Sequence, residues 1–289
     1  MSIGLIILRA EEKEKCIMII SYEHFIEVLN QKIKFGLELY IELLQTIIKN
    51  PQRYCGIFRV SNAKTKLIQN VTQSQEIKFG DFLEDIVTEY IGILGYENKE
   101  KNLGEDADGN VLNADQVFVS GGTVYFVEQK VRDDHDSTKK RGQFANFTKK
   151  IRRVKELYPD KHLVAIMWFC DDGLRKNRRY YQGEMENASF ENTELHLYYG
   201  AGFLHSIQGG TDVWDEIVSY LTRYRMEHVN YSLTIPDFGT SQDIYDALVA
   251  LPSAEWRKLV SDDPTYCSLR EELFSNGNNI ERARTAREN

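Results

Sequence analysis

Asp115, Glu128 and Lys130 have the residue types and the spacing to support chemistry on a bound water molecule. Residues two positions apart on a β-strand point to the same face, so Glu128 and Lys130 would project together. If Asp115 lay opposite Glu128 on a paired strand, the two carboxylates would be about 5 Å apart and would repel each other without a positive charge between them. A divalent metal is the usual counter-charge, and oxygen ligands suit Mg²⁺ or Mn²⁺. Lys130 would then stand beside the metal, where it could orient a water molecule and stabilise negative charge.

A β-hairpin is the element that must bring these side chains together. The segment 117–127 is rich in β-branched and aromatic residues and is interrupted by Gly121-Gly122, which is typical of two strands joined by a tight turn. With a two-residue turn, paired residue numbers sum to 243, and Asp115 lies opposite Glu128. With a three-residue turn, Asp115 would instead lie opposite Val127, and the metal-site interpretation would fail.

The elements around the hairpin predict the fold class. Apolar residues recur at helical spacing over 79–94 and 142–157, whereas 162–170 is almost wholly apolar and 195–199 is a further strand candidate. The resulting order is helix, hairpin, helix, buried strand, strand. This order predicts an α/β core with a mixed central β-sheet flanked by helices.

We expect three regions in one compact unit. Residues 1–78 form an N-terminal helical region, residues 79–235 form the core, and residues 236–289 form a C-terminal helical region. The last fifteen residues, from Ser275, are polar and rich in Asn and Arg, so we expect this tail to fray.

Length and composition exclude several classes of protein. The chain has 289 residues, of which 42% are hydrophobic and 28% charged, as in ordinary globular domains. No apolar run approaches the ~18 residues of a membrane span. The four cysteines are scattered and form no CxxC pair, which argues against a structural zinc site or a disulfide framework. We therefore expect a cytoplasmic protein that does not enter a membrane.

The charge of the chain is unevenly distributed. A formal net charge of −8, taken as a whole, argues against a polyanionic partner such as nucleic acid. However, the segment from Lys130 to Lys161 holds eleven basic and five acidic residues and carries +6, so the rest of the chain carries −14. Charged residues on a hairpin are common on solvated surfaces, but here a strongly basic helix follows the carboxylates directly. The position of the charge therefore favours a polyanionic partner at this site.

These features together resemble the PD-(D/E)XK nuclease superfamily over roughly residues 80–200. The resemblance rests on Asp115, the tripeptide Glu128-Gln129-Lys130 after a short hairpin, the basic helix and the buried strand. The stretch from Glu128 to Gln143 also looks like that of type II restriction endonucleases, and it is similar to the group that cleaves the interrupted palindrome GANTC. The resemblance implies a restriction-endonuclease-like core with added N- and C-terminal helical regions.

The resemblance implies a role for each matching residue. Asp115 and Glu128 match the metal-binding acidic pair, and Lys130 matches the lysine that positions the attacking water. Gln129 matches the position whose backbone carbonyl often ligates the metal. The residue before Asp115 is Ala114, whereas the family has proline there. That position supplies no ligand, so the departure lowers the specificity of the motif and leaves the chemistry intact.

Further residues around the motif are less firmly placed. Glu84 lies on the helix before the sheet, where some family members have another carboxylate near the metal, but Asp85 and Glu89 compete for that role. Gln143 lies at the start of the next helix, where some members have a glutamine near the active site. His135, in an acidic loop after Lys130, is either a functional group or part of a solvated loop.

Two basic clusters are candidates for contact with DNA. The first begins the helix after the hairpin, and the second follows the buried strand, where it could bind phosphates or contact guanine in the major groove. A solvated basic turn would explain the second cluster equally well. The candidates are Lys139, Lys140, Arg141, Gln143, Arg175, Lys176, Arg178 and Arg179.

The sequence therefore predicts a Mg²⁺-dependent type II restriction endonuclease that cleaves double-stranded DNA at a short specific site. Asp115, Glu128 and Lys130 would be catalytic, and the protein would act as a homodimer because palindromic sites are usually cut by two-fold dimers. Two alternatives stay open. One is a repair or junction-specific nuclease of the same fold, which would nick DNA according to its structure. The other is a non-catalytic DNA-binding module, which would bind DNA without cleaving it in any metal.

Overall fold

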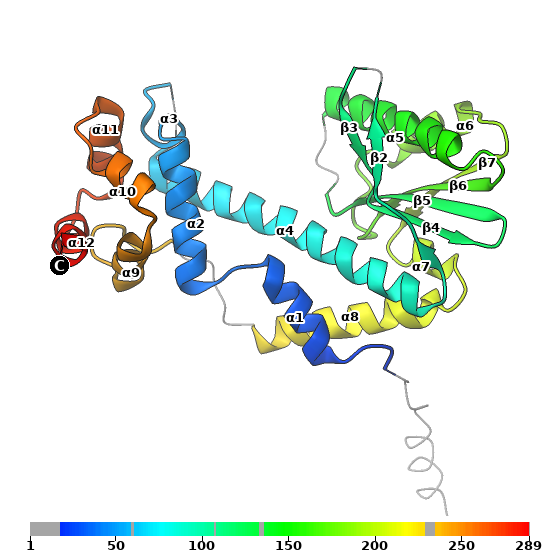
Figure 1. The fold of residues 1–289 in the computed structure, drawn as a ribbon, viewed down its shortest axis with the longest axis horizontal. Helices are drawn as coiled ribbons and strands as arrows, with labels where there is room; N and C mark the ends of the chain where they lie inside the picture. Colours follow the sequence, from blue (N-terminus) through cyan, green and yellow to red (C-terminus); the bar gives the residue numbers. More distant parts are fainter. Residues whose placement is uncertain (1–17, 59–60, 107, 133–135, 229–234, 289) are drawn as a thin grey trace, which may run out of the picture. The chain divides into compact units, whose positions relative to one another are not determined.

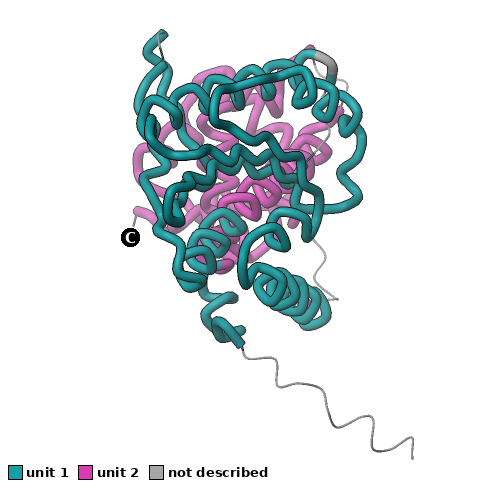
Figure 2. Tube along the Cα trace, turned by 90° about the vertical axis from the view of Figure 1, so that its right-hand side faces the viewer, with its two compact units in different colours: residues 1–28, 82–227 teal, residues 29–81, 228–289 magenta. Residues whose placement is uncertain are grey.

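The computed structural model of the chain describes residues 18–58, 61–106, 108–132, 136–228 and 235–288. His135 lies outside the described residues. The chain divides into two compact units, drawn in two colours in Figure 2: unit 1 comprises residues 1–28 and 82–227, and unit 2 comprises residues 29–81 and 228–289. The sequence predicted one compact unit, and the structure differs because each unit has its own cluster of buried apolar residues.

Unit 1 contains a mixed five-stranded sheet, as predicted (Figure 1). Its strand order is β1-β4-β5-β6-β7. The first two pairings, β1 with β4 and β4 with β5, are antiparallel, whereas β5 with β6 and β6 with β7 are parallel. The short strands β2 and β3 form a separate antiparallel pair. The bounds are β1 Glu97–Asn98, β2 Asn102–Glu105, β3 Val111–Asn113, β4 Gln116–Ser120, β5 Thr123–Lys130, β6 His162–Phe169 and β7 Thr193–Tyr199.

The register of the β4–β5 hairpin confirms the two-residue turn. Ser120 pairs with Thr123, and the ladder continues to Gln116 opposite Val127, so every pair sums to 243. Gly121 adopts a φ of +57°, a backbone conformation that side chains with a Cβ atom rarely take. Glycine at this position therefore permits the tight turn on which the register depends.

Helices α5 (Ser137–Leu157) and α6 (Arg178–Asn187) cover one face of this sheet. Phe147 and Ile151 of α5 and Tyr181 of α6 are fully buried in one cluster with Phe126 of β5 and Met167 of β6. These apolar contacts fix the rotation of α5 about its own axis, and hence which of its many basic residues face the sheet.

The opposite face of the sheet packs against aromatic residues of two later helices. Phe118 of β4 and Trp168 of β6 contact Phe203 of α7 (Gly202–His205), with ring centroids 6.4 and 5.0 Å apart. Trp168 also lies 6.3 Å from Trp214 of α8 (Gly210–Glu227). Glu216 of α8 then accepts a hydrogen bond of 2.8 Å from the Tyr90 hydroxyl of α4 (Ala63–Ile93). Both faces of the sheet are therefore covered, as in an α/β core.

Unit 2 is helical and joins distant parts of the chain. Leu44, from the N-terminal side, and Leu248, from the C-terminal side, belong to the same buried cluster. The regions predicted as separate additions at the two ends thus share one core. The predicted boundary at residue 78 also falls inside α4, which is continuous there. Besides parts of α4 and of α1 (Tyr22–Lys32), the helices are α2 Gly36–Lys49, α3 Gln52–Cys55, α9 Gln242–Ala250, α10 Ser253–Leu259, α11 Pro264–Leu273 and α12 Asn279–Glu288.

The C-terminal tail does not fray as the sequence suggested. Residues 279–288 form helix α12, in which Ile280 and Ala283 are buried in the core of unit 2. Asn279 anchors the start of the helix, since its amide donates to the carbonyl oxygens of Phe238 and Ser241 at 3.1 and 2.8 Å. The tail has low average hydrophobicity, but two of its apolar residues lie in the core, and polar contacts such as those of Asn279 add to the docking. None of the helices in the described part of the chain is both long and apolar enough to cross a membrane.

The docking of α12 can be tested by shortening a buried side chain. Ile280→Ala should lower the free energy of unfolding by about 2–5 kcal/mol, because the lost methyl groups leave a cavity. The measurement is urea denaturation followed by far-UV circular dichroism. Arg284→Ala, on the exposed side of the same helix, should change stability by less than about 0.5 kcal/mol. Equal small effects of both substitutions would mean that the tail frays.

Candidate active site

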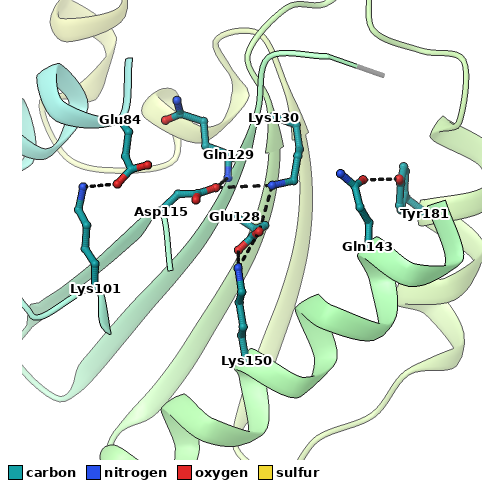
Figure 3. Close-up of polar contacts among 9 residues, drawn as sticks. All are labelled: Glu84, Lys101, Asp115, Glu128, Gln129, Lys130, Gln143, Lys150 and Tyr181. Atoms are coloured by element: carbon teal, nitrogen blue, oxygen red, sulfur yellow. Dashed lines mark hydrogen bonds and ion pairs between the residues drawn. The ribbon is translucent and has the colours of Figure 1, made fainter. Parts of the chain in front are cut away.

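Asp115 and the residues at the end of β5 meet at one end of the hairpin (Figure 3). Asp115 directly precedes β4, and its Oδ2 accepts a hydrogen bond of 2.6 Å from the backbone N–H of Gln129. The regular ladder stops one residue earlier, at Gln116 and Val127. The side chain of Asp115 therefore crosses to the neighbouring strand and is held there by the backbone. Glu128 and Lys130 project together, as strand alternation predicts.

Lys130 links the two carboxylates. Its Nζ lies 3.0 Å from Glu128 Oε1 and 3.6 Å from Asp115 Oδ2. The three side chains predicted to act together are thus brought together, and the positive charge between the carboxylates is an ammonium group. The site lies at the carboxyl end of β5, beside the parallel strand β6, where Lys130 pairs with Phe169.

Lys150 is a fourth member of this cluster that the sequence did not single out. It lies on α5, and its Nζ lies 2.9 Å from Glu128 Oε1 and 2.8 Å from Glu128 Oε2. Its side chain is only 7% exposed, although lysine is rarely buried without a charged partner. The helical spacing of Phe147, Ile151 and Val154 contained the signal, because position 150 falls within the same sheet-facing stripe.

Burial and charge shift the pKa values of the two acids in opposite directions. Burial first, and then the nearby charge of Glu128, raises the pKa of Asp115 from its ordinary 3.8 to about 6. Burial also acts to raise the pKa of Glu128, but the ammonium groups of Lys130 and Lys150 outweigh it and lower that pKa. Burial acts to lower the pKa of Lys130, and the two carboxylates more than reverse the effect. Glu128 is therefore the more strongly acidic of the two carboxyl groups. Asp115 is half protonated only at about pH 6.

Glu84 lies beside this cluster without joining it as a third acidic ligand. Its carboxylate accepts a hydrogen bond of 2.7 Å from Lys101, and its backbone carbonyl accepts one of 2.8 Å from the buried side chain of Gln116. Glu89, a competitor for the same role, instead lies 2.9 Å from His24. No set of three His, Cys, Asp or Glu residues among the described residues is arranged to hold a metal.

The donor set nevertheless fits a hard divalent cation. Asp115 and Glu128 present carboxylate oxygens in one small buried region, and cationic groups already occupy the space beside them. Carboxylate and carbonyl oxygens are the ligands that Mg²⁺ prefers. The backbone carbonyl of Gln129 is a further oxygen donor in the same strand segment.

The basic candidates lie at the start of two neighbouring helices. Lys140 of α5 stacks over the ring of Tyr180 in α6, at 4.6 Å from its centroid, and the Tyr181 hydroxyl donates to Gln143 Oε1 at 2.8 Å. These contacts bring the two predicted basic clusters side by side. Arg178 lies 5.2 Å from the ring centroid of Tyr199. Side chains exposed to solvent are Lys139, Arg141, Arg175, Lys176, Arg178 and Arg179.

Comparison with known proteins gives one match. A family model described as type II restriction endonuclease, HinfI, matches residues 21–116 and 93–225. The matched segments together include all the candidate residues described above. No curated protein and no solved structure matches the chain.

The opposite pKa shifts predict opposite effects of neutralising the two acids in metal-free protein. At pH 8, Glu128→Gln should lower the free energy of unfolding by about 3–5 kcal/mol, because it leaves two buried ammonium groups with one partner. Asp115→Asn should raise it, because ionised Asp115 is disfavoured in the folded state and asparagine can still accept the Gln129 hydrogen bond.

Urea denaturation in EDTA measures both effects. Because the pKa of Asp115 is higher in the folded state, its ionisation costs stability above about pH 6, and this cost vanishes below its ordinary value of 3.8. The advantage of Asp115→Asn should therefore shrink as the pH falls between these values. A destabilising effect of Asp115→Asn at pH 8 would contradict the assigned direction of its pKa shift.

Proposed function

The chain belongs to the HinfI family of type II restriction endonucleases, and we propose that Asp115, Glu128 and Lys130 form its catalytic site and that Mg²⁺ is its cofactor. As a member of this family, the protein is a site-specific endonuclease that acts on DNA. The observation that carries the residue assignment is the position of Lys130 Nζ between two carboxylates. The cytoplasmic location expected from the sequence stays a prediction.

Each residue of the cluster has a distinct part in phosphodiester hydrolysis. Asp115 and Glu128, with the backbone carbonyl of Gln129, would hold the cation. Glu84 would become an additional ligand only if its carboxylate were released from Lys101. Bound there, Mg²⁺ would lower the pKa of a water molecule and neutralise charge on the phosphate and leaving oxygen. Lys130 would place its ammonium group against the attacking water and the negative charge that develops on the phosphoryl oxygens.

The adjoining starts of α5 and α6 form the surface that we propose for DNA. Phosphate contacts come from Lys139, Lys140 and Arg141 on α5 and from Arg175, Lys176, Arg178 and Arg179 around the start of α6. Gln143, held by Tyr181, lies on α5 between this surface and Lys150. The proposed surface on α5 therefore begins about two and a half turns from Lys150 along the same helix.

The target and the assembly follow from the same assignment. The resemblance of residues 128–143 to the GANTC-cleaving group makes this interrupted palindrome the site that we propose. A palindrome presents the same bases to each half of a two-fold dimer, so we propose that the protein cuts as a homodimer.

The catalytic assignment predicts which substitutions stop cleavage. With Mg²⁺, the purified protein should cut plasmid DNA into discrete fragments, and EDTA should prevent this. Asp115→Ala, Glu128→Ala and Lys130→Ala should each lower the rate at least about 100-fold while the circular dichroism spectrum stays that of a folded protein. Undiminished cleavage by folded Glu128→Ala protein would exclude this mechanism.

The DNA surface predicts a change in salt dependence. Lys139→Ala should weaken binding to a GANTC duplex in EDTA and reduce the slope of log K against log salt by about 1. Fluorescence anisotropy between about 50 and 200 mM salt measures this slope. Lys161→Ala is the matched control, because Lys161 donates to the carbonyl of Gly121 at the far end of β5. An unchanged slope in Lys139→Ala would remove α5 from the interface.

A further inference from the structure

We propose that Lys150 is a positioning residue that competes with the divalent cation for Glu128, so that the protein binds the cation weakly until DNA is present. The inference rests on the proposed metal site at Asp115 and Glu128. Lys150 itself touches neither metal nor DNA in this scheme, and it acts through Glu128.

The contacts of Lys150 place it in direct competition with a metal. Its Nζ is within 2.9 Å of one Glu128 oxygen and 2.8 Å of the other, and Lys130 also contacts Oε1. Every carboxylate oxygen of Glu128 is therefore already paired with an ammonium group. A cation that binds Glu128 must therefore share these oxygens with the Lys150 ammonium group or displace it, and the two positive charges repel each other in a buried region.

The position of Lys150 is set by the helix that carries it. Helix α5 begins at the cap residue Asp136, whose Oδ1 accepts from the backbone N–H groups of Thr138 and Lys139 at 2.9 and 2.8 Å. Fully buried Phe147 and Ile151 hold the same stretch against the sheet. The backbone of Lys150 is thus held over the sheet, and its buried side chain lies against Glu128.

The charges of the cluster explain why bound DNA should raise the affinity of the site for the cation. Two carboxylates and two ammonium groups sum to zero when all four are ionised, so the site is balanced without a metal. A dication added alone would leave an excess charge of +2 in a buried region, which is unfavourable. The phosphodiester group and the attacking hydroxide each bring one negative charge and restore the balance. Cation and DNA should therefore bind cooperatively, each raising the affinity of the other.

Titration of the full-length protein with Mn²⁺ in the absence of DNA tests the proposal. Free Mn²⁺ is followed by its electron paramagnetic resonance signal. Lys150→Met removes the competing charge and keeps an unbranched side chain of similar length, so it should bind Mn²⁺ at least about tenfold more tightly than wild type. Adding a GANTC duplex should tighten binding strongly in the wild type and much less in Lys150→Met.

Lys149→Met is the matched control. It removes the same charge at the next position of α5, where the side chain is 47% exposed and pairs with Asp106 at 3.1 Å. Its Mn²⁺ affinity without DNA should equal that of the wild type. If Lys150→Met does not fold, Lys150→Gln removes the charge while retaining a hydrogen-bond donor for Glu128, and it should show the same tightening.

The outcomes separate this inference from the proposed function. Loss of Mn²⁺ binding in Glu128→Ala, with affinity in Lys150→Met no higher than in wild type, would overturn the role of Lys150 and leave the metal site standing. Mn²⁺ binding that is unaffected by Glu128→Ala, or absent from every variant with and without DNA, would overturn the metal site itself. Tight binding in wild-type protein without DNA would also contradict the competition.

Discussion

The buried carboxylate of Glu128 is the constraint around which the rest of the site is arranged. An ionised acid at the carboxyl end of an internal strand is costly unless charged partners surround it. Two elements supply those partners: β5 itself contributes Lys130, and α5 contributes Lys150. The helix is therefore an electrostatic part of the site as well as a cover for the sheet. Burial and then the nearby charge of Glu128 raise the pKa of the second acid, Asp115, and its contact with the shared Lys130 offsets them only in part.

The topology of the sheet explains why the site lies where it does. β5 is antiparallel to β4 on one side and parallel to β6 on the other, so its carboxyl end lies beside the start of β4 and the end of β6. Asp115 can then reach the backbone of Gln129 from the start of β4. Gln116, the first residue of β4, is held by Thr88 and by the carbonyl of Glu84, so α4 fixes the strand that carries Asp115.

The hairpin could be predicted from the sequence and its register narrowed to two alternatives, whereas contacts between distant elements could not be predicted. Gly121-Gly122 indicates a tight turn locally, and alternation along a strand places Glu128 and Lys130 on one face, but only the observed ladder selects the two-residue turn. The contact of Lys150 with Glu128 could not be recognised among the many basic residues of α5, because the adjacent Lys149 is exposed. The partner of Glu84, Lys101, lies in the connection between β1 and β2, and no sequence pattern indicates this contact. The shared core of unit 2 could not be predicted either, because Leu44 and Leu248 are about 200 residues apart in the sequence and come together only in the fold.

The positions of the basic residues on α5 are more informative than the net charge of the chain. α5 directs one lysine inward, where Lys150 balances Glu128, while Lys149 on the next position faces outward and pairs with Asp106. Its first turn carries exposed Lys139 and Arg141, next to the basic start of α6. One helix thus presents positive charge to a carboxylate within the protein and, at its exposed start, to the surface that we propose for DNA. Because apolar residues fix the rotation of α5, these two surfaces cannot be repositioned independently. If DNA binds at the surface that we propose, a phosphate at the start of α5 would be linked through one helix to the charge balance at Glu128, and substrate and cation would then affect the binding of each other.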